Sequence, residues 1–99
     1  MKRMYLLLRL DLAANYMIGQ GAHALASFVF EHPDEFTEWN NGTISALGIR
    51  NVSSMRELMG ALTYFKNVFS VWNEPDQEGA PTAIACYAEE RAFHQLPPM

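Results

Sequence analysis

An almost continuous apolar run, MYLLLRL, occupies residues 4–10 near the start of the chain. Such a run is typical of a β-strand that is covered on both faces in an α/β sheet. The chain has 99 residues, which suffice for one hydrophobic core, whereas two cores would each be too small to stabilise a domain. The sequence therefore predicts a single α/β domain over residues 1–99.

A segment with helical periodicity follows at residues 16–32. Its apolar and small residues recur at the spacing of a helix that packs on a flat surface, and they are Met17, Ile18, Ala22, Leu25, Ala26 and Val29. The first half also contains Gly19 and Gly21, and glycine disfavours a helix. We therefore expect this helix to approach the sheet or a ligand closely, which would compensate for its glycines.

The remaining elements alternate between helices and strands. A proline predicts the start of a short helix at residues 33–39, which Asn-Asn-Gly then ends. Another helix is expected at residues 51–67, where Ser54 and Glu57 have capping-box spacing and one face carries Met55, Leu58, Met59, Leu62 and Phe65. We expect strands at residues 43–49, 68–73 and 81–88 and a short terminal helix at 89–99. This order predicts a mixed sheet with helices packed on it.

The charge balance limits the classes of partner. The formal net charge is −4, and the seven lysines and arginines are scattered singly after Lys2 and Arg3. A protein that grips a long nucleic acid neutralises several phosphates at once, so this composition argues against extensive binding to a nucleic-acid backbone. A small anionic ligand, held by one or two arginines and by backbone N–H groups, is compatible with it.

The single cysteine and the first residues of the chain indicate the cellular compartment in which we expect the protein. Cys86 stands alone, so an intrachain disulfide and a cysteine-built metal site are excluded, and we expect a buried, small apolar side chain. The opening MKRMYLLLRLDLA has too short an apolar run for an export signal, because Arg9 and Asp11 interrupt it. No run is long enough to span a bilayer. We expect a cytoplasmic protein without a membrane partner.

Three polar residues share one stripe of the helix expected at residues 16–32. Gln20, His23 and Ser27 stand at positions i, i+3 and i+7, which places them on one side of a helix. A lone histidine on a helix is more often structural than catalytic, but the nearby glutamine and small residues favour the wall of a binding site. No second histidine or carboxylate has metal-ligand spacing beside it, so we expect neither a metal nor a cofactor.

An acidic loop is the second candidate region. Glu74, Asp76 and Glu78 lie in a loop that contains proline and glycine, and such loops are most often solvated turns. A carboxylate at the end of a strand can instead orient a water molecule or accept a hydrogen bond from a ligand, and Glu74 is the best placed of the three. Trp72 is either a core residue or a stacking surface for a ring.

The chain contains, in this order, the segments LLLRLDL, IGQGAHALASF, HPDEFTEWNNG, SSMRELMGAL and NEPDQEGAPTAIACYA. In order and spacing they resemble the type 2 peptidyl-tRNA hydrolases, the archaeal and eukaryotic class, and most of all its short divergent members from bacteria and phages. The resemblance implies a mixed four-stranded sheet sandwiched by helices, a three-layer α/β/α domain that commonly forms a homodimer. Enzymes of this family hydrolyse the ester that joins a peptide to tRNA.

The resemblance also implies a set of site residues. Arg9 and Asp11 match the end of the family's first strand, and Gln20 and His23 match its first-helix motif. Thr82 matches a threonine that opens the last strand, although it is not the threonine usually assigned to the active site.

Three positions depart from the family pattern, and two further residues extend the predicted site. Glu74 stands where the family has an important aspartate, and the active-site threonine falls at residues 76–78, which contain no hydroxyl group. The family's important lysine falls at or beside Tyr16. A cation at this position would stabilise negative charge on the ester oxygen, and its loss would weaken the stabilisation of the transition state by on the order of 3 kcal/mol. Gly19 and Trp72 complete the ligand-binding residues that we predict.

These observations leave three hypotheses about function. The preferred one is a small binding protein that holds a nucleotide-like molecule, with a glycine-rich helix start that offers N–H groups to a phosphate; a phage could use it to sequester a host nucleotide signal. The second is an active peptidyl-tRNA hydrolase that acts on the 3′ end of tRNA, with Glu74 positioning water and His23 assisting. The third is a protein-interaction module that relies on exposed Met, Phe and Trp side chains.

Overall fold

The structure is a computed structural model that describes residues 1–93. In this part of the chain the elements are β1 Lys2–Arg9, α1 Ala14–Glu31, α2 Pro33–Trp39, β2 Ile44–Ile49, α3 Val52–Tyr64, β3 Val68–Glu74, η1 Pro75–Gln77, β4 Ala80–Glu89 and η2 Glu90–Phe93, where η denotes a 3₁₀ helix. The predicted strands and the three longer predicted helices are present, with ends shifted by a few residues at most. The helix predicted at 89–99 is a 3₁₀ turn as far as Phe93, and its remainder lies outside the described residues.

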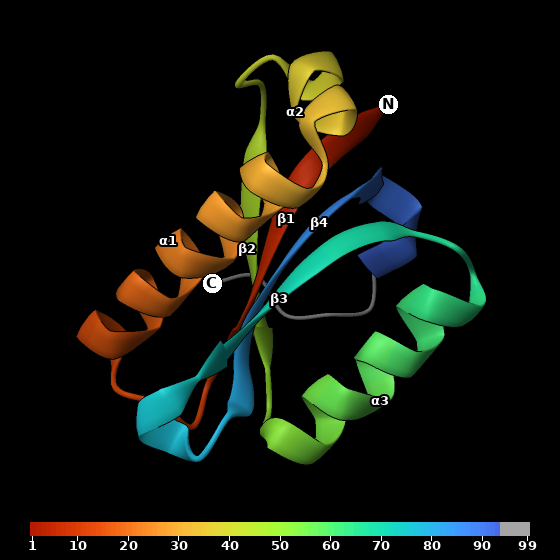
Figure 1. Cartoon of the computed structure of the whole chain (residues 1–99). Coiled ribbons are helices and arrows are strands. Elements are labelled where there is room, and N and C mark those ends of the chain that lie inside the picture. Colours follow the sequence, from red (N-terminus) through yellow and green to blue (C-terminus); the bar gives the residue numbers. More distant parts are fainter. Residues whose placement is uncertain (94–99) are drawn as a thin grey trace.

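The four strands form one mixed sheet in the order β2-β1-β4-β3. β1 pairs in parallel with β2, and β4 is antiparallel to both β1 and β3. β1, β2 and β3 therefore run in the same direction, and their carboxyl ends lie at the same end of the sheet (Figure 1). The predicted mixed four-stranded sheet is confirmed.

Helices cover the sheet on both faces. α1 and α2 lie on one face and α3 lies on the other (Figure 1). Along β1, Tyr5 and Leu7 pack in the core on the α3 side, whereas Met4 and Leu8 pack in the core on the α1 side, as the alternation of side chains along a strand requires. Because both faces are buried, the middle of the central strand β1, residues 4–8, contains no charged residue. The predicted α/β domain therefore has three layers.

The buried face of α1 differs from the predicted one. Its buried residues are Met17, Gln20, Gly21, Ala24 and Phe28, a spacing that forms one continuous stripe. Of the residues predicted to be buried, Ala22 and Ala26 are exposed, and Ile18 and Val29 are 72% and 37% exposed. No charged residue occurs from Ala14 to Phe30, so both sides of the helix are apolar and small, and periodicity alone does not distinguish them.

The expected close approach of α1 to the sheet occurs at one of its two glycines. A Cβ atom added to Gly21 would lie 3.0 Å from Leu8 Cδ2 of β1, whereas one added to Gly19 would meet nothing within 4 Å. Gly21 therefore allows the helix to lie close to the sheet, and Gly19 is on the side that faces solvent.

The start of α3 is capped by a residue other than the predicted one. Asn51 is the N-cap, and its side chain accepts a hydrogen bond of 2.9 Å from the backbone N–H of Ser54. The capping box predicted from Ser54 and Glu57 was wrong, because the helix begins three residues earlier, where an asparagine can satisfy the free N–H groups. Phe65, predicted to share the buried face, lies just beyond the helix and is 72% exposed.

Cys86 is fully buried in the core between the sheet and α3, as predicted, and burial raises the pKa of its thiol to about 12. The unfolded chain loses this proton near the ordinary thiol pKa, so above about pH 9 it binds fewer protons than the folded chain. The thiol should therefore lower the free energy of unfolding by about 1 kcal/mol between pH 8 and 10. Urea titrations of the protein and of Cys86→Ala at both values measure this, and equal losses in the two proteins would contradict it.

Candidate functional site

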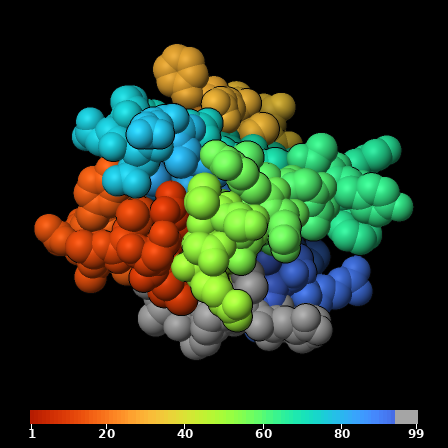
Figure 2. All heavy atoms as spheres, turned by 90° about the horizontal axis from the view of Figure 1, so that it is seen from below, coloured from red at the N-terminus to blue at the C-terminus, as the bar shows by residue number. Residues whose placement is uncertain are grey.

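The candidate site lies at the end of the sheet where β1 and β3 finish. Arg9 ends β1, Glu74 ends β3 and Thr82 lies near the start of β4. Figure 2 views the molecule from this end, where the loop around η1, the orange start of α1 and the green start of α3 come together. Ligands of α/β proteins commonly bind outside the carboxyl ends of the strands, so this is the expected location of a site.

A chain of buried hydrogen bonds joins three of the predicted site residues. Thr82 donates from Oγ1 to Gln20 Oε1 over 2.6 Å, and Gln20 donates from Nε2 to Glu74 Oε1 over 3.1 Å. The exposed fractions of Gln20, Glu74 and Thr82 are 4%, 9% and 1%. The Gln20 amide thus links α1 to both β3 and β4, and it holds the Glu74 carboxylate in one orientation. We call these three residues the polar triad.

His23 and Trp72 form a stacked pair next to the polar triad. Their ring centroids are 4.4 Å apart and the ring planes differ by 12°. Thr82 Oγ1 also lies 3.4 Å from the backbone oxygen of Trp72. The Trp72 indole nitrogen is shielded from solvent and has no hydrogen-bond partner within the described part of the chain. The pair therefore combines an aromatic surface with a buried donor that has no partner.

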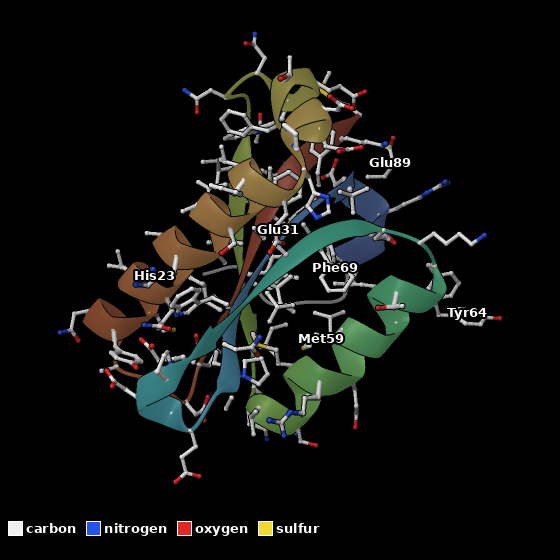
Figure 3. All side chains as sticks on the ribbon, viewed as in Figure 1. His23, Glu31, Met59, Tyr64, Phe69 and Glu89 are labelled. Atoms are coloured by element: carbon white, nitrogen blue, oxygen red, sulfur yellow. The ribbon has the colours of Figure 1, made fainter. Side chains whose placement is uncertain are left out.

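A shallow pocket of about 320 Å³ borders this stacked pair. It is lined by His23, Ala26, Ser27, Phe30, Glu31 and Trp72. Glu31 is held at one end by a hydrogen bond of 2.6 Å that Ser70 Oγ donates to its carboxylate. In Figure 3, His23 and Glu31 project from α1, which crosses the sheet beside β3. The pocket thus combines aromatic walls with a hydroxyl group and a carboxylate.

Arg9 and Asp11 engage each other. Asp11 accepts two hydrogen bonds from the Arg9 guanidinium, 3.0 Å from Nε and 2.7 Å from Nη2, and Arg9 Nη1 donates to the Pro81 backbone oxygen over 3.2 Å. The hydrogen bond to Arg9 lowers the pKa of Asp11 and raises the pKa of Arg9. The hydrogen bond to Pro81 joins the end of β1 to the start of β4. The Asp11 carboxylate neutralises the positive charge of Arg9.

Tyr16 stands beside the polar triad, where the family resemblance implies a lysine. Its hydroxyl oxygen is buried and has no hydrogen bond of good geometry within residues 1–93. Burial, and then the negative charges of Glu74 and Asp76, raise the pKa of Tyr16. The position is therefore neutral, and it supplies no positive charge to the site.

Gly19 lies on the exposed side of α1. α1 begins at Ala14, so Gly19 falls in its second turn, beyond the first residues of a helix, whose N–H groups are free. The start of the helix therefore contains no glycine, and phosphate binding by its N–H groups stays a prediction. Asp76 and Glu78 are exposed on the loop, as predicted.

The pocket lining includes residues that sequence reasoning did not select. Phe30 and Glu31 line the pocket, and Ser27 was noted only as part of the polar stripe. Their position follows from where α1 crosses β3, which no local pattern specifies. Within residues 1–93, no group of three His, Cys, Asp or Glu side chains could hold a metal ion.

The chain matches no protein-family model and no curated protein. Within the described residues, no helix is both long and apolar enough to cross a membrane.

Proposed function

We propose that the protein binds a nucleotide-like small molecule at the stacked pair, without hydrolysing it. The observation that carries the proposal is the parallel stack of His23 on Trp72 beside a pocket of about 320 Å³. Flat aromatic side chains bind bases through their π-faces and tolerate different bases. A nucleobase that enters the pocket would contact the edge of this stack and the exposed ring of Phe30.

The polar groups of the pocket suit the edge of a base. The Ser27 hydroxyl and the Glu31 carboxylate line the pocket, and both can accept hydrogen bonds from an exocyclic amino group. Glu74 and Asp76 add negative charge around Tyr16, and Asp11 already neutralises Arg9. The surroundings therefore favour the base over the phosphate, so bases with amino groups should bind better than uracil.

Binding is supported over catalysis by the contacts of Glu74. Its carboxylate accepts a hydrogen bond from Gln20, and within the described residues it forms no ion pair. Ester hydrolysis needs a group that stabilises the developing oxyanion, and beside the polar triad Tyr16 offers a neutral hydroxyl where the family resemblance implies a cation. Recognition of a ligand at the stacked pair needs no such group.

A thermal-shift screen tests this proposal. A ligand at ten times its Kd stabilises the folded chain by about 1.4 kcal/mol, which should raise Tm by roughly 5–10 °C for a domain of this size. We expect adenosine and its monophosphate to bind within about threefold of each other, since exposed charges contribute little. His23→Ala should abolish the shift, and the exposed Glu57→Ala on α3 should retain it. A flat response to nucleosides and nucleotides would contradict the proposal.

A divergent peptidyl-tRNA hydrolase is the second candidate. The observation that favours it is the meeting of Gln20, Glu74 and Thr82, three residues that the family resemblance selects from distant parts of the chain. If Glu74 positions the attacking water, Glu74→Gln should lower the rate of peptidyl-tRNA cleavage by about 10²-fold or more, whereas Asp76→Asn on the neighbouring exposed position should not. The binding proposal predicts no cleavage above background by any of the three proteins.

Homodimer formation, which the resemblance implies, stays a prediction. The outer side of α1 exposes Ile18 and Phe30, at 72% and 90%, and this apolar surface is available to a partner. Light scattering after size-exclusion chromatography would measure the mass in solution.

A further inference from the structure

A second cavity lies at the opposite end of the sheet from the candidate site. Its volume is about 560 Å³, within the range of small-molecule pockets. It is bounded by the end of α3, the start of β3, the end of β4 and η2, on the side of the molecule where Tyr64 and Glu89 are labelled in Figure 3. Apolar side chains, including Leu62, Phe65 and Phe93, form its walls.

Positive charge is concentrated around this cavity. Lys2, Lys66 and Arg91 line it, although the whole chain has seven lysines and arginines and a net charge of −4. Among the described lining residues the one carboxylate is Glu89, and the N-terminal amino group of Met1 pairs with it at 2.8 Å. That contact also lowers the pKa of Glu89. The cavity therefore has apolar walls and a net positive rim.

The backbone at Lys66 adds an independent observation. Lys66 follows α3 with a φ of 58°, the left-handed conformation that favours glycine. Its N–H bonds to Thr63 O, and the N–H of Asn67 bonds to Leu62 O, which together form the Schellman motif that ends many helices. Glycine would adopt this conformation with less strain. A lysine at this position is thus unfavourable for the backbone, and the residue lines the cavity.

We propose that this cavity binds a small amphipathic anion, a carboxylate with an aliphatic body. The apolar body packs against Phe65 and Phe93, and the carboxylate faces Lys2 and Lys66. Apolar walls with a few convergent charged groups are the usual composition of such a pocket. The cavity is separate from the nucleobase pocket, so the two ligands bind independently.

Decanoate and 1-decanol, titrated into the protein below their micelle and solubility limits, test the proposal. The two probes have the same chain length and differ in the charge of the head group. Lys2 and Lys66 at the rim should make decanoate bind about tenfold more tightly than decanol. Equal affinity for the two probes, or no binding of decanoate, would overturn the proposal.

Lys66→Gly separates ligand binding from folding. The substitution removes one rim cation and relieves the backbone, so Tm should rise while the Kd for decanoate increases about threefold. Arg56→Gln, which removes an exposed cation from α3 outside the cavity lining, should leave this Kd within about twofold. Trp72→Ala should also leave it unchanged. An unaltered Kd in Lys66→Gly, or the same weakening in Arg56→Gln or Trp72→Ala, would overturn the assignment to this cavity.

Discussion

Phe28→Ala is expected to lower the free energy of unfolding by about 3–5 kcal/mol, the range for truncating a buried phenylalanine. Phe28 has no exposed surface and lies in the core between α1 and the sheet. The truncation leaves a cavity that the packed helix and strands can fill only in part. Urea denaturation monitored by circular dichroism measures the loss.

Phe30→Ala is the matched control for this substitution, because it removes the same atoms two residues further along the same helix. Phe30 is 90% exposed, so its loss should change stability by no more than about 0.5 kcal/mol. Because α1 turns Phe28 toward the sheet and Phe30 toward solvent, the two variants should differ strongly in their free energy of unfolding. Similar losses would show that the helix packs through another face.

Gln20→Leu is expected to lower the free energy of unfolding by about 3 kcal/mol, because two buried groups lose their partner at once. Gln20 Nε2 donates to Glu74, and Gln20 Oε1 accepts from Thr82. Leucine has a similar volume but no polar atoms, so the buried Glu74 carboxylate would lose its donor and the Thr82 hydroxyl would keep only the longer contact of 3.4 Å to the backbone oxygen of Trp72. Urea denaturation at neutral pH provides the value.

Two further variants define the contribution of the polar triad. Thr82→Val removes the hydroxyl that donates to Gln20 and also lies near Trp72 O, and it should lower the free energy of unfolding by about 1–2 kcal/mol. Asn15→Leu replaces an exposed amide on the same helix and should stay within about 0.5 kcal/mol. If Gln20→Leu is as mild as Asn15→Leu, the polar triad contributes nothing to stability, and its geometry would need another explanation.

The strands and α2 follow directly from local sequence. The run at residues 4–10 is apolar at nearly every position because β1 is covered on both faces. α2 has the predicted bounds since Pro33 sets its start and Asn40 ends it in the left-handed conformation. In both cases the residues that determine the element lie within a few positions of each other, so the local sequence pattern suffices to predict it.

The orientation of α1 and the contacts of the site depend on the tertiary structure. Both sides of α1 are apolar, so the choice of Phe28 over Ile18 for the core is made by the shape of the sheet. The resemblance selected Gln20, His23 and Glu74 as residues, but their partners are set by where α1 crosses β3. The cavity at the other end was missed because Lys2 and Lys66 are far apart in sequence.

The most direct test of ligand binding at the stacked pair is a nuclear magnetic resonance titration of the two tryptophan indole N–H groups with adenosine. Trp39 Nε1 donates to Thr43 O over 3.0 Å, away from the candidate pocket, whereas Trp72 lines that pocket and its Nε1 has no partner among the described residues. We predict that adenosine shifts the Trp72 signal saturably and leaves the Trp39 signal in place. A Trp72 signal that stays unchanged, or a shift at Trp39 alone, would contradict the account.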